Sequence, residues 1–351
     1  MSKTAYLLLE NGEVLTGRFF GAEGTIVGEV VFCTTMVGYL ETITDPAYEG
    51  QIILQTFPII GNYGVIEEDF ESENVTPRAY VVKYDCKNPS NFRNEGSLDE
   101  LFKTKGVIGV SGIDTRKLTK IIREHGVMNA KILDTKPTDK DILEVKNYKI
   151  ESAVSKASKP VAEVEGEGDL TVALLDLGAQ KSITDHLVKR GCKVQSFGYD
   201  AEFEEILKTS PNGVMVSGGP GDPNDPANVK TIGTIKKLQA AKIPIFGICL
   251  GHLLLAVANG YKAEKMKFGH RGASQPVKDM NTGKLYASNQ NHGYVAVAED
   301  SWFVNVNDKT CEGLKYNENV FGVQFRPTAG TPNTEFLYDE FVERMKENAV
   351  R

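Results

Sequence analysis

The sequence predicts an α/β protein of two domains, and three observations carry this prediction. The 351 residues exceed the roughly 150 residues of an average domain. A stretch of small and charged residues, 152–169 (SAVSKASKPVAEVEGEGD), interrupts the apolar pattern, as linkers do. The pattern also changes from short strands before this stretch to alternating strands and helices after it. We therefore expect a smaller strand-rich domain over 1–150, a linker over 151–169, and a domain over 170–351 with a doubly wound, mostly parallel sheet.

Short apolar runs dominate the first predicted domain. Strands are expected at 5–9, 14–20, 52–57 and 80–84. Asn11-Gly12 separates the first two runs, which predicts a β-hairpin. Residues 114–124 place Leu118, Ile121 and Ile122 at helical spacing. The sequence therefore predicts a small domain rich in strands for this half.

The second predicted domain alternates strands with helices. Strands are expected at 170–175, 193–197, 213–217 and 243–246, with helices at 181–190 and 229–241. This alternation predicts a parallel sheet that helices cover on both faces.

Composition excludes several classes of protein. The net charge of -7 argues against a protein that binds nucleic acid or an anionic membrane. The first ten residues do not resemble a signal peptide, and no apolar run reaches the 18 or so residues of a membrane span. The five cysteines are scattered and odd in number, so we expect neither disulfides nor a metal site. A reducing, cytoplasmic location follows.

The strongest chemical signal surrounds Cys249. A strand ends near Gly247 and a helix begins near Gly251, with Cys249 in the turn between them. Glycines on both sides of a nucleophile at such a turn are typical of a nucleophile elbow. The pattern predicts an exposed sulfur, a thiolate favoured by the helix N-terminus, and backbone N–H groups for an oxyanion. The alternative is an inert buried thiol.

Two weaker signals flank this turn in the sequence. The glycine-rich run 217–223 (SGGPGDP) follows a strand and offers backbone amides to a carboxylate or oxyanion; the alternative is an ordinary turn. The run 288–294 (SNQNHGY) combines amides, an imidazole and an aromatic ring, and could equally be a hydrogen-bonded surface turn. His252 is expected to pack in a helix, and His270 is expected at the surface or in a loop.

These motifs resemble the class I glutamine amidotransferases, through FGICLGH around Cys249 and SGGPGDP around Gly219. The first half narrows the resemblance. The segments MVGYLETITDP (36–46), IGNYG (60–64) and GIDTRKL (112–118) are similar to the N-terminal domain of carbamoyl-phosphate synthetase small subunits. The resemblance covers nearly the whole chain in the right order, and it disfavours other amidotransferases, which lack this first half.

The resemblance implies a division of labour between two subunits. The small subunit hydrolyses glutamine through a cysteine thioester, and a large subunit uses the ammonia, bicarbonate and ATP to make carbamoyl phosphate for pyrimidine and arginine synthesis. Cys249 would be the nucleophile. The glutamine pocket would be lined by Gly219, Gly221, Leu250, Asn291, Gly293 and Tyr294. This chain would itself hold no cofactor, and no Gly-x-x-x-x-Gly-Lys-Ser/Thr motif for ATP occurs in it.

The sequence departs from the family pattern at four positions. The catalytic His and Glu of the family are replaced by Arg326 and Thr328 after the strand Gly322-Val-Gln-Phe325. Two pocket positions, a Gln and a Ser in the family, hold Leu253 and Ala47. Since arginine stays protonated at neutral pH, it cannot cycle a proton. The sequence therefore favours a lost or weak glutaminase. The alternatives are an active glutaminase in which His292 or His270 is the base, and a structural or regulatory subunit of an ammonia-dependent synthetase.

Overall fold

The computed structural model describes residues 3–159, 164–327 and 334–350, and the chain divides into two compact units, 1–151 and 152–351. The units are described separately. None of the described helices combines the length and the apolar character that a bilayer crossing needs.

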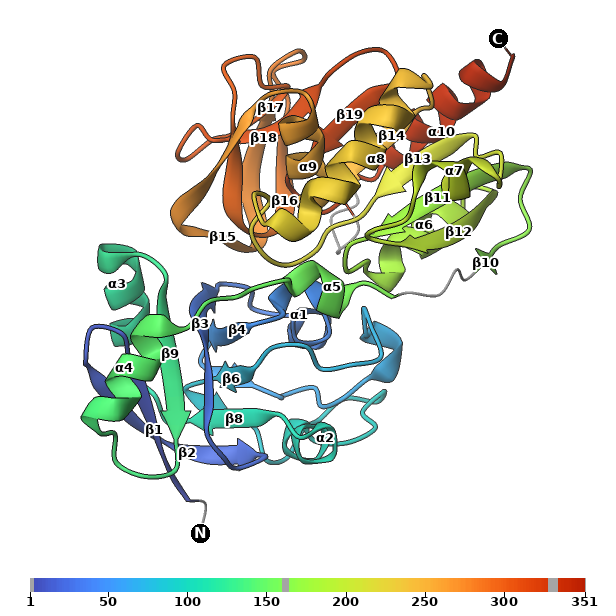
Figure 1. The fold of residues 1–351 in the computed structure, drawn as a ribbon. Helices are drawn as coiled ribbons and strands as arrows, with labels where there is room; N and C mark the ends of the chain where they lie inside the picture. The colour runs from blue at the N-terminus through green and yellow to red at the C-terminus, as the bar shows by residue number, and fades with distance from the viewer. Residues whose placement is uncertain (1–2, 160–163, 328–333, 351) are drawn as a thin grey trace. The chain divides into compact units, whose positions relative to one another are not determined.

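The first unit is built around a closed barrel (Figure 1). Its strands are β1 (Thr4–Leu9), β2 (Val14–Gly21), β3 (Ile26–Cys33), β4 (Gln51–Gln55), β5 (Ile59–Ile60), β6 (Ala79–Val81), β7 (Tyr84–Asp85), β8 (Ile108–Ser111) and β9 (Met128–Leu133). Its helices are α1 (Tyr39–Ile43), η1 (Pro46–Tyr48), η2 (Glu67–Asp69), α2 (Leu98–Lys105), α3 (Thr115–His125) and α4 (Asp139–Asn147). The barrel follows the order β1-β2-β8-β6-β4-β3-β9.

Most of the expected elements of this unit are confirmed. β1 and β2 form the antiparallel hairpin across Asn11-Gly12, with Leu8 paired to Val14. Asp114 caps α3 by accepting a hydrogen bond from the backbone of Lys117, which explains why the helix begins at Thr115. The strand expected at 80–84 is wrong as a single element, because β6 joins the barrel whereas β7 pairs with β5. Closure of the barrel was not predicted.

The second unit is built on one long mixed sheet. Its strands are β10 (Val164–Glu165), β11 (Leu170–Asp176), β12 (Cys192–Gly198), β13 (Gly213–Val216), β14 (Ile245–Ile248), β15 (Lys262–Asp279), β16 (Leu285–Val297), β17 (Phe303–Asn305), β18 (Cys311–Lys315) and β19 (Val320–Val323). Its helices are α5 (Ala153–Ala157), α6 (Lys181–Val188), α7 (Phe203–Leu207), η3 (Pro226–Asn228), α8 (Val229–Ala240), α9 (Leu250–Ala258) and α10 (Phe336–Val350).

The central strands β12-β11-β13-β14-β19 are parallel, as the sequence predicts. Successive side chains of β11 enter opposite cores, because strand side chains alternate between faces. Val172 and Leu174 join the core under α6 and α10, whereas Ala173 and Leu175 join the core under α8 and α9. Helices thus cover both faces of the parallel part. Beyond β19 the sheet continues as the antiparallel strands β18, β17, β15 and β16, which were not predicted from the sequence.

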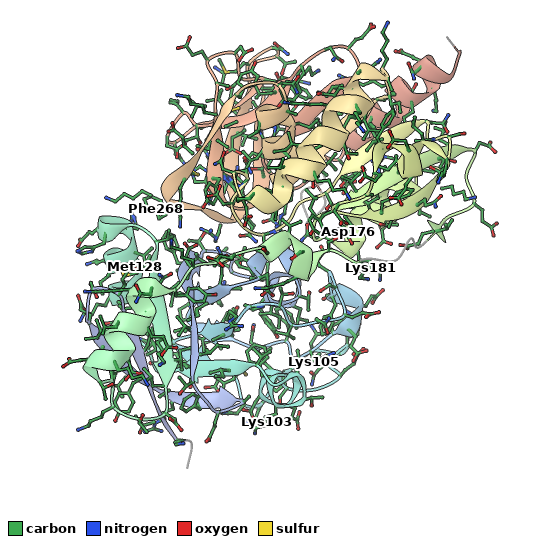
Figure 2. The ribbon with its side chains drawn as sticks, in the orientation of Figure 1. Lys103, Lys105, Met128, Asp176, Lys181 and Phe268 are labelled. Atoms are coloured by element: carbon green, nitrogen blue, oxygen red, sulfur yellow. The ribbon has the colours of Figure 1, made fainter. Side chains whose placement is uncertain are left out.

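The segment expected as a linker, 151–169, is structured where it is described. It carries α5 and β10 and belongs to the second unit, apart from its first residue. Asp176, at the end of β11 (Figure 2), holds it by accepting a hydrogen bond from the backbone N–H of Lys159 at 3.1 Å. The Ser158 hydroxyl also accepts from the backbone of Tyr199 at 3.0 Å. Small residues here permit close contact with the sheet.

Candidate active site

Cys249 occupies the turn between β14 and α9 in a conformation that L-residues rarely adopt. Its φ of 53° and ψ of -109° make it one of few non-glycine residues with positive φ in the described chain. Such conformations cost about 1–3 kcal/mol and persist where the surroundings enforce them. Here the Cys249 N–H donates to Val323 O at 2.9 Å, and the Gly251 N–H donates to Ser217 O at 3.0 Å. The geometry of a nucleophile elbow is therefore present.

The glycines around Cys249 are sterically required. A Cβ on Gly247 would lie 2.4 Å from Leu255 Cδ1, and a Cβ on Gly251 would lie 2.2 Å from the Val216 carbonyl oxygen. Neither contact leaves room for a side chain. The Gly-x-Cys-x-Gly pattern thus lets α9 approach β13 and β14 closely enough to form the turn.

Gly251→Ala should destabilise the second unit by about 1–3 kcal/mol, because the new methyl group meets backbone oxygens that cannot move cheaply. Gly233→Ala is the matched control, since Gly233 lies in α8 with nothing within 4 Å of its added Cβ. That change should stabilise by about 1 kcal/mol, because alanine favours a helix interior over glycine. Denaturant unfolding measures both changes, and shifts of the same sign would contradict this account of the turn.

The thiol is buried, contrary to the sequence prediction of an exposed sulfur. Cys249 is 3% exposed and belongs to the core that α6 and α10 cover. Its Sγ lies 3.5 Å from the backbone oxygen of Asn291, to which it donates. The expectation considered only the turn, whereas the antiparallel strand β16, on which Asn291 lies, covers the sulfur.

The glycine-rich run after β13 lies beside this thiol. A Cβ on Gly218 would be 3.5 Å from the Cβ of Cys249, which places the two backbones next to each other. Gly219 could carry no side chain, since its Cβ would lie 2.2 Å from Leu177 O. Gly221 has a φ of +92°, which glycine adopts without strain. The structure therefore brings together the cysteine and the loop that the sequence pairs with it.

The other predicted pocket residues lie on different elements of the fold. Asn291, Gly293 and Tyr294 all lie on β16. Leu250 is 2% exposed and packs in the core under α8 and α9, so only its backbone could meet a ligand. Leu253 packs with Ala296 and Leu314. Ala47 is a buried residue of η1 in the first unit.

Arg326 lies just beyond the carboxyl end of β19. This strand is the parallel neighbour of β14, and Ile248 pairs with Val323. The Arg326 N–H donates to Asn289 O at 2.8 Å, and the residue is 4% exposed. Parallel strands place their carboxyl ends at one edge of a sheet, so Arg326 follows the strand next to the one that ends at Cys249. Thr328 lies outside the described residues.

Arg271 is 4% exposed, and its place near the site was not predicted from the sequence. Arg271 pairs with Asn291 across β15 and β16, and its Nη1 donates to the backbone oxygen of Phe268 at 3.0 Å. A Cβ on Gly293 would lie 3.0 Å from Arg271 Nη2, so Gly293 leaves space for this side chain. The one signal that could have found Arg271 is its position directly after His270 in the sequence.

Three histidines of this unit are buried. His252 is fully buried on α9, as expected, and burial lowers its pKa to about 3. His292 places Nδ1 2.9 Å from Tyr294 O and Nε2 3.2 Å from Gln290 Oε1. His270 is 9% exposed on β15, with Nε2 2.8 Å from Asp308 Oδ2. The surface or loop position expected for His270 is therefore wrong, because β15 continues through it and pairs it with His292.

Comparison with known proteins identifies the family. A model described as "Carbamoyl-phosphate synthase small chain, CPSase domain" matches residues 7–132, and "Glutamine amidotransferase class-I" matches residues 173–344. A carbamoyl phosphate synthase small chain of Archaeoglobus fulgidus is 45% identical, and the alignment covers 98% of this chain and 99% of that relative. The chain belongs to the carbamoyl phosphate synthase small chain family. The small chain of Clostridium perfringens is 45% identical, and its alignment covers 97% of this chain and 99% of that relative. The small chain of Staphylococcus epidermidis is 43% identical, and its alignment covers 99% of this chain and 97% of that relative.

Membership of the carbamoyl phosphate synthase small chain family confirms the resemblance drawn from the motifs of both halves. The amidotransferase match begins in β11 and ends in α10, so it spans the sheet that carries Cys249. The expected fold of the second unit is confirmed with it. The catalytic role of Cys249 and the pocket roles of the other residues, which the resemblance implies, remain predictions.

Proposed function

We propose that this chain is the small subunit of a carbamoyl phosphate synthase that works mainly with free ammonia, because its own glutaminase step is lost or very weak. The single observation that carries the proposal is the buried Arg326 at the carboxyl end of β19, beside the strand that leads to Cys249. The fold retains a nucleophile elbow, but the family's proton acceptor is missing.

The chemistry of the thioester step explains the expected loss. A cysteine nucleophile needs a base that takes the thiol proton and later returns it to the leaving ammonia. A guanidinium stays protonated at neutral pH, so Arg326 cannot accept the thiol proton. Its positive charge can stabilise a thiolate, but it cannot take the thiol proton and later donate it to the leaving ammonia.

The neighbouring histidines do not offer a ready replacement. Both ring nitrogens of His292 already face Tyr294 and Gln290. His270 bridges Asp308 and Glu312. His252 has no hydrogen-bond partner on either ring nitrogen among the described residues, and its low pKa makes it a poor base. Each ring would need to move before it could serve Cys249.

Leu253 and Ala47, which replace the family's Gln and Ser, should also weaken glutamine hydrolysis. A buried amide substrate loses about 1–3 kcal/mol for each polar partner that is removed. Leu253 contributes to an apolar cluster rather than a polar wall, and Ala47 carries no polar side chain. We infer that glutamine binds more weakly here than in relatives with Gln and Ser at these positions.

The partner and setting follow from the incomplete reaction. We propose a separate large subunit as the partner, because this chain has no phosphate-binding Gly-x-x-x-x-Gly-Lys-Ser/Thr motif for ATP. Glutamine is at most a poor substrate, and no cofactor is required in this chain. All five cysteines are free thiols, which agrees with a cytoplasmic setting. The product would enter pyrimidine or arginine synthesis.

Cys249 should react readily with an alkylating agent even though the chain hydrolyses glutamine slowly or not at all. Iodoacetamide should modify Cys249 faster than Cys192 or Cys311, although all three are at most 3% exposed. Burial raises the pKa of Cys192 and Cys311 to about 11, whereas Cys249 caps the N-terminus of α9, which favours a thiolate. Peptide mapping over time measures the three rates. Equal rates would show that the helix does not activate Cys249.

A further inference from the structure

Three strands of the second unit bring two histidines and a glutamate together in its interior. His270 on β15 and His292 on β16 are direct cross-strand partners, and Glu312 lies on β18. Glu312 is completely buried, and the two histidines are 9% and 5% exposed. Charged and ionisable groups are rarely buried without a compensating partner, so this cluster needs an explanation beyond packing.

The ring orientations leave one nitrogen of each histidine facing Glu312. His270 Nε2 lies 2.8 Å from Asp308 Oδ2, and His292 Nδ1 lies 2.9 Å from Tyr294 O. A carboxylate and a carbonyl can only accept, so these two nitrogens carry the hydrogens. His270 Nδ1 then faces Glu312 Oε1 at 3.3 Å, and His292 Nε2 faces Glu312 Oε2 at 4.0 Å. Metal-binding histidines are oriented by outer carboxylate and carbonyl partners in the same way.

Electron-rich atoms converge at the centre of this cluster. Oε2 of Glu312 accepts no hydrogen bond from the described residues, whereas Oε1 accepts from Asn305 Nδ2 at 3.0 Å. His292 Nε2 lies 4.0 Å from Oε2 and 3.2 Å from Gln290 Oε1, so two acceptor oxygens face this nitrogen. Reversing the Gln290 amide would give Nε2 a donor, but would remove the hydrogen bond with which Gln290 supports the Glu312 carboxylate. A cation at the centre would balance the charge of the Glu312 carboxylate and give Oε2 a partner.

A proton is the competing occupant on the His270 side. Burial alone would lower the pKa of His270, but the hydrogen bonds and charges of Glu312 and Asp308 outweigh burial and raise it. The proton can bridge only His270 and Glu312 Oε1. It leaves Glu312 Oε2 without a partner among the described residues, because His292 Nε2 lies 4.0 Å away, too far for a direct hydrogen bond.

We propose that His270, His292 and Glu312 bind one divalent transition-metal ion of the zinc class. Their ligand atoms all lie within 4.8 Å of one another. Tetrahedral zinc at about 2.0–2.1 Å from its ligands requires ligand atoms roughly 3.3 Å apart, a separation that the His270–Glu312 pair already has. Two imidazoles and a carboxylate suit zinc better than magnesium or calcium, which prefer oxygen ligands. The scattered cysteines gave no hint of this site.

The ion would tie β15, β16 and β18 together next to Asn291, whose backbone oxygen contacts Cys249 Sγ. Its role is therefore to fix the strands that cover the thiol. The three ligands lie outside the proposed triad and pocket positions, so metal binding does not depend on whether Arg326 blocks glutamine hydrolysis. A catalytic base at His270 or His292 would exclude it.

Metal binding by the full-length chain tests the proposal. The protein is stripped with a chelator, dialysed against Zn²⁺ or Co²⁺, and analysed for metal content. We expect about one ion per chain and visible bands of four-coordinate Co²⁺ without a thiolate charge-transfer band. Glu312→Gln, which keeps the shape of the side chain, should lose the ion. His125→Gln, which changes an exposed histidine of the first unit, should retain it. Zinc should raise the Tm of the unmodified chain but not of Glu312→Gln.

Absence of bound metal in the unmodified chain would overturn the proposal, as would equal binding by Glu312→Gln. A thiolate charge-transfer band would place the ion on a cysteine and would overturn it too. If Glu312→Gln fails to fold, X-ray absorption at the zinc edge of the unmodified chain decides. Two imidazole nitrogens with oxygen support the site, whereas sulfur or an all-oxygen shell contradicts it.

Discussion

Glutamine hydrolysis should rise by about 10²–10⁴-fold when Arg326→His and Thr328→Glu are introduced together, because that is the usual contribution of a positioned acid–base group. Either change alone should give much less, since members of a catalytic unit act non-additively. The imidazole would replace a permanently charged guanidinium at the end of β19, and the carboxylate would orient it. Adding Leu253→Gln should increase the gain further by restoring a polar group to the pocket. Glutamate release in the presence of the large subunit is the measurement.

The matched control for this rescue is Arg326→Gln with Thr328→Glu. It removes the same positive charge but supplies no base, so its glutaminase activity should stay at the starting level. Cys249→Ala in the rescued background should abolish the gain. An equal gain from the Gln control would show that the charge of Arg326, rather than the missing base, limits the reaction.

The assembled complex should make carbamoyl phosphate from ammonium salts far faster than from glutamine. We expect a difference of about 10²–10⁴, set by the missing base, because ammonia bypasses the step at Cys249. Carbamoyl phosphate formation is measured with each nitrogen source at saturating bicarbonate and ATP. A small subunit with an intact triad, bound to the same large subunit, should restore the rate with glutamine.

Cys249→Ala serves as the control for this second prediction. It should leave the ammonia-dependent rate unchanged, because the thiol takes no part in the use of free ammonia. A glutamine-dependent rate that approaches the ammonia-dependent one, and falls in Cys249→Ala, would contradict the proposed function.

Local sequence signals predicted much of the fold. The strands and helices from β11 to α9, except the short α7 and η3, were predicted because apolar runs, a glycine-flanked turn and helix-terminal residues act over short distances. The elbow at Cys249 follows from two glycines whose replacement by larger residues would clash. These features depend on neighbours in the chain, which the sequence displays directly.

Features that depend on distant pairing were not predicted. Barrel closure joins β1 to β9, which are far apart in sequence. The burial of Cys249 depends on Asn291, and the cluster around Glu312 depends on the pairing of β15 with β16 and on β18. His270 was misplaced for this reason, since a lone histidine in a polar segment gives no sign of its partner across the sheet. Contacts between residues that are far apart in sequence form only when the chain folds, so a short stretch of sequence does not reveal them.

The most direct test of the central claim is glutamate release by the unmodified chain assembled with its large subunit. The missing base predicts turnover far below about 1 s⁻¹, the lower end of the ordinary enzyme range. Turnover of about 1 s⁻¹ or faster that Cys249→Ala abolishes would contradict the claim, and would show that another residue acts as the base for this thiol.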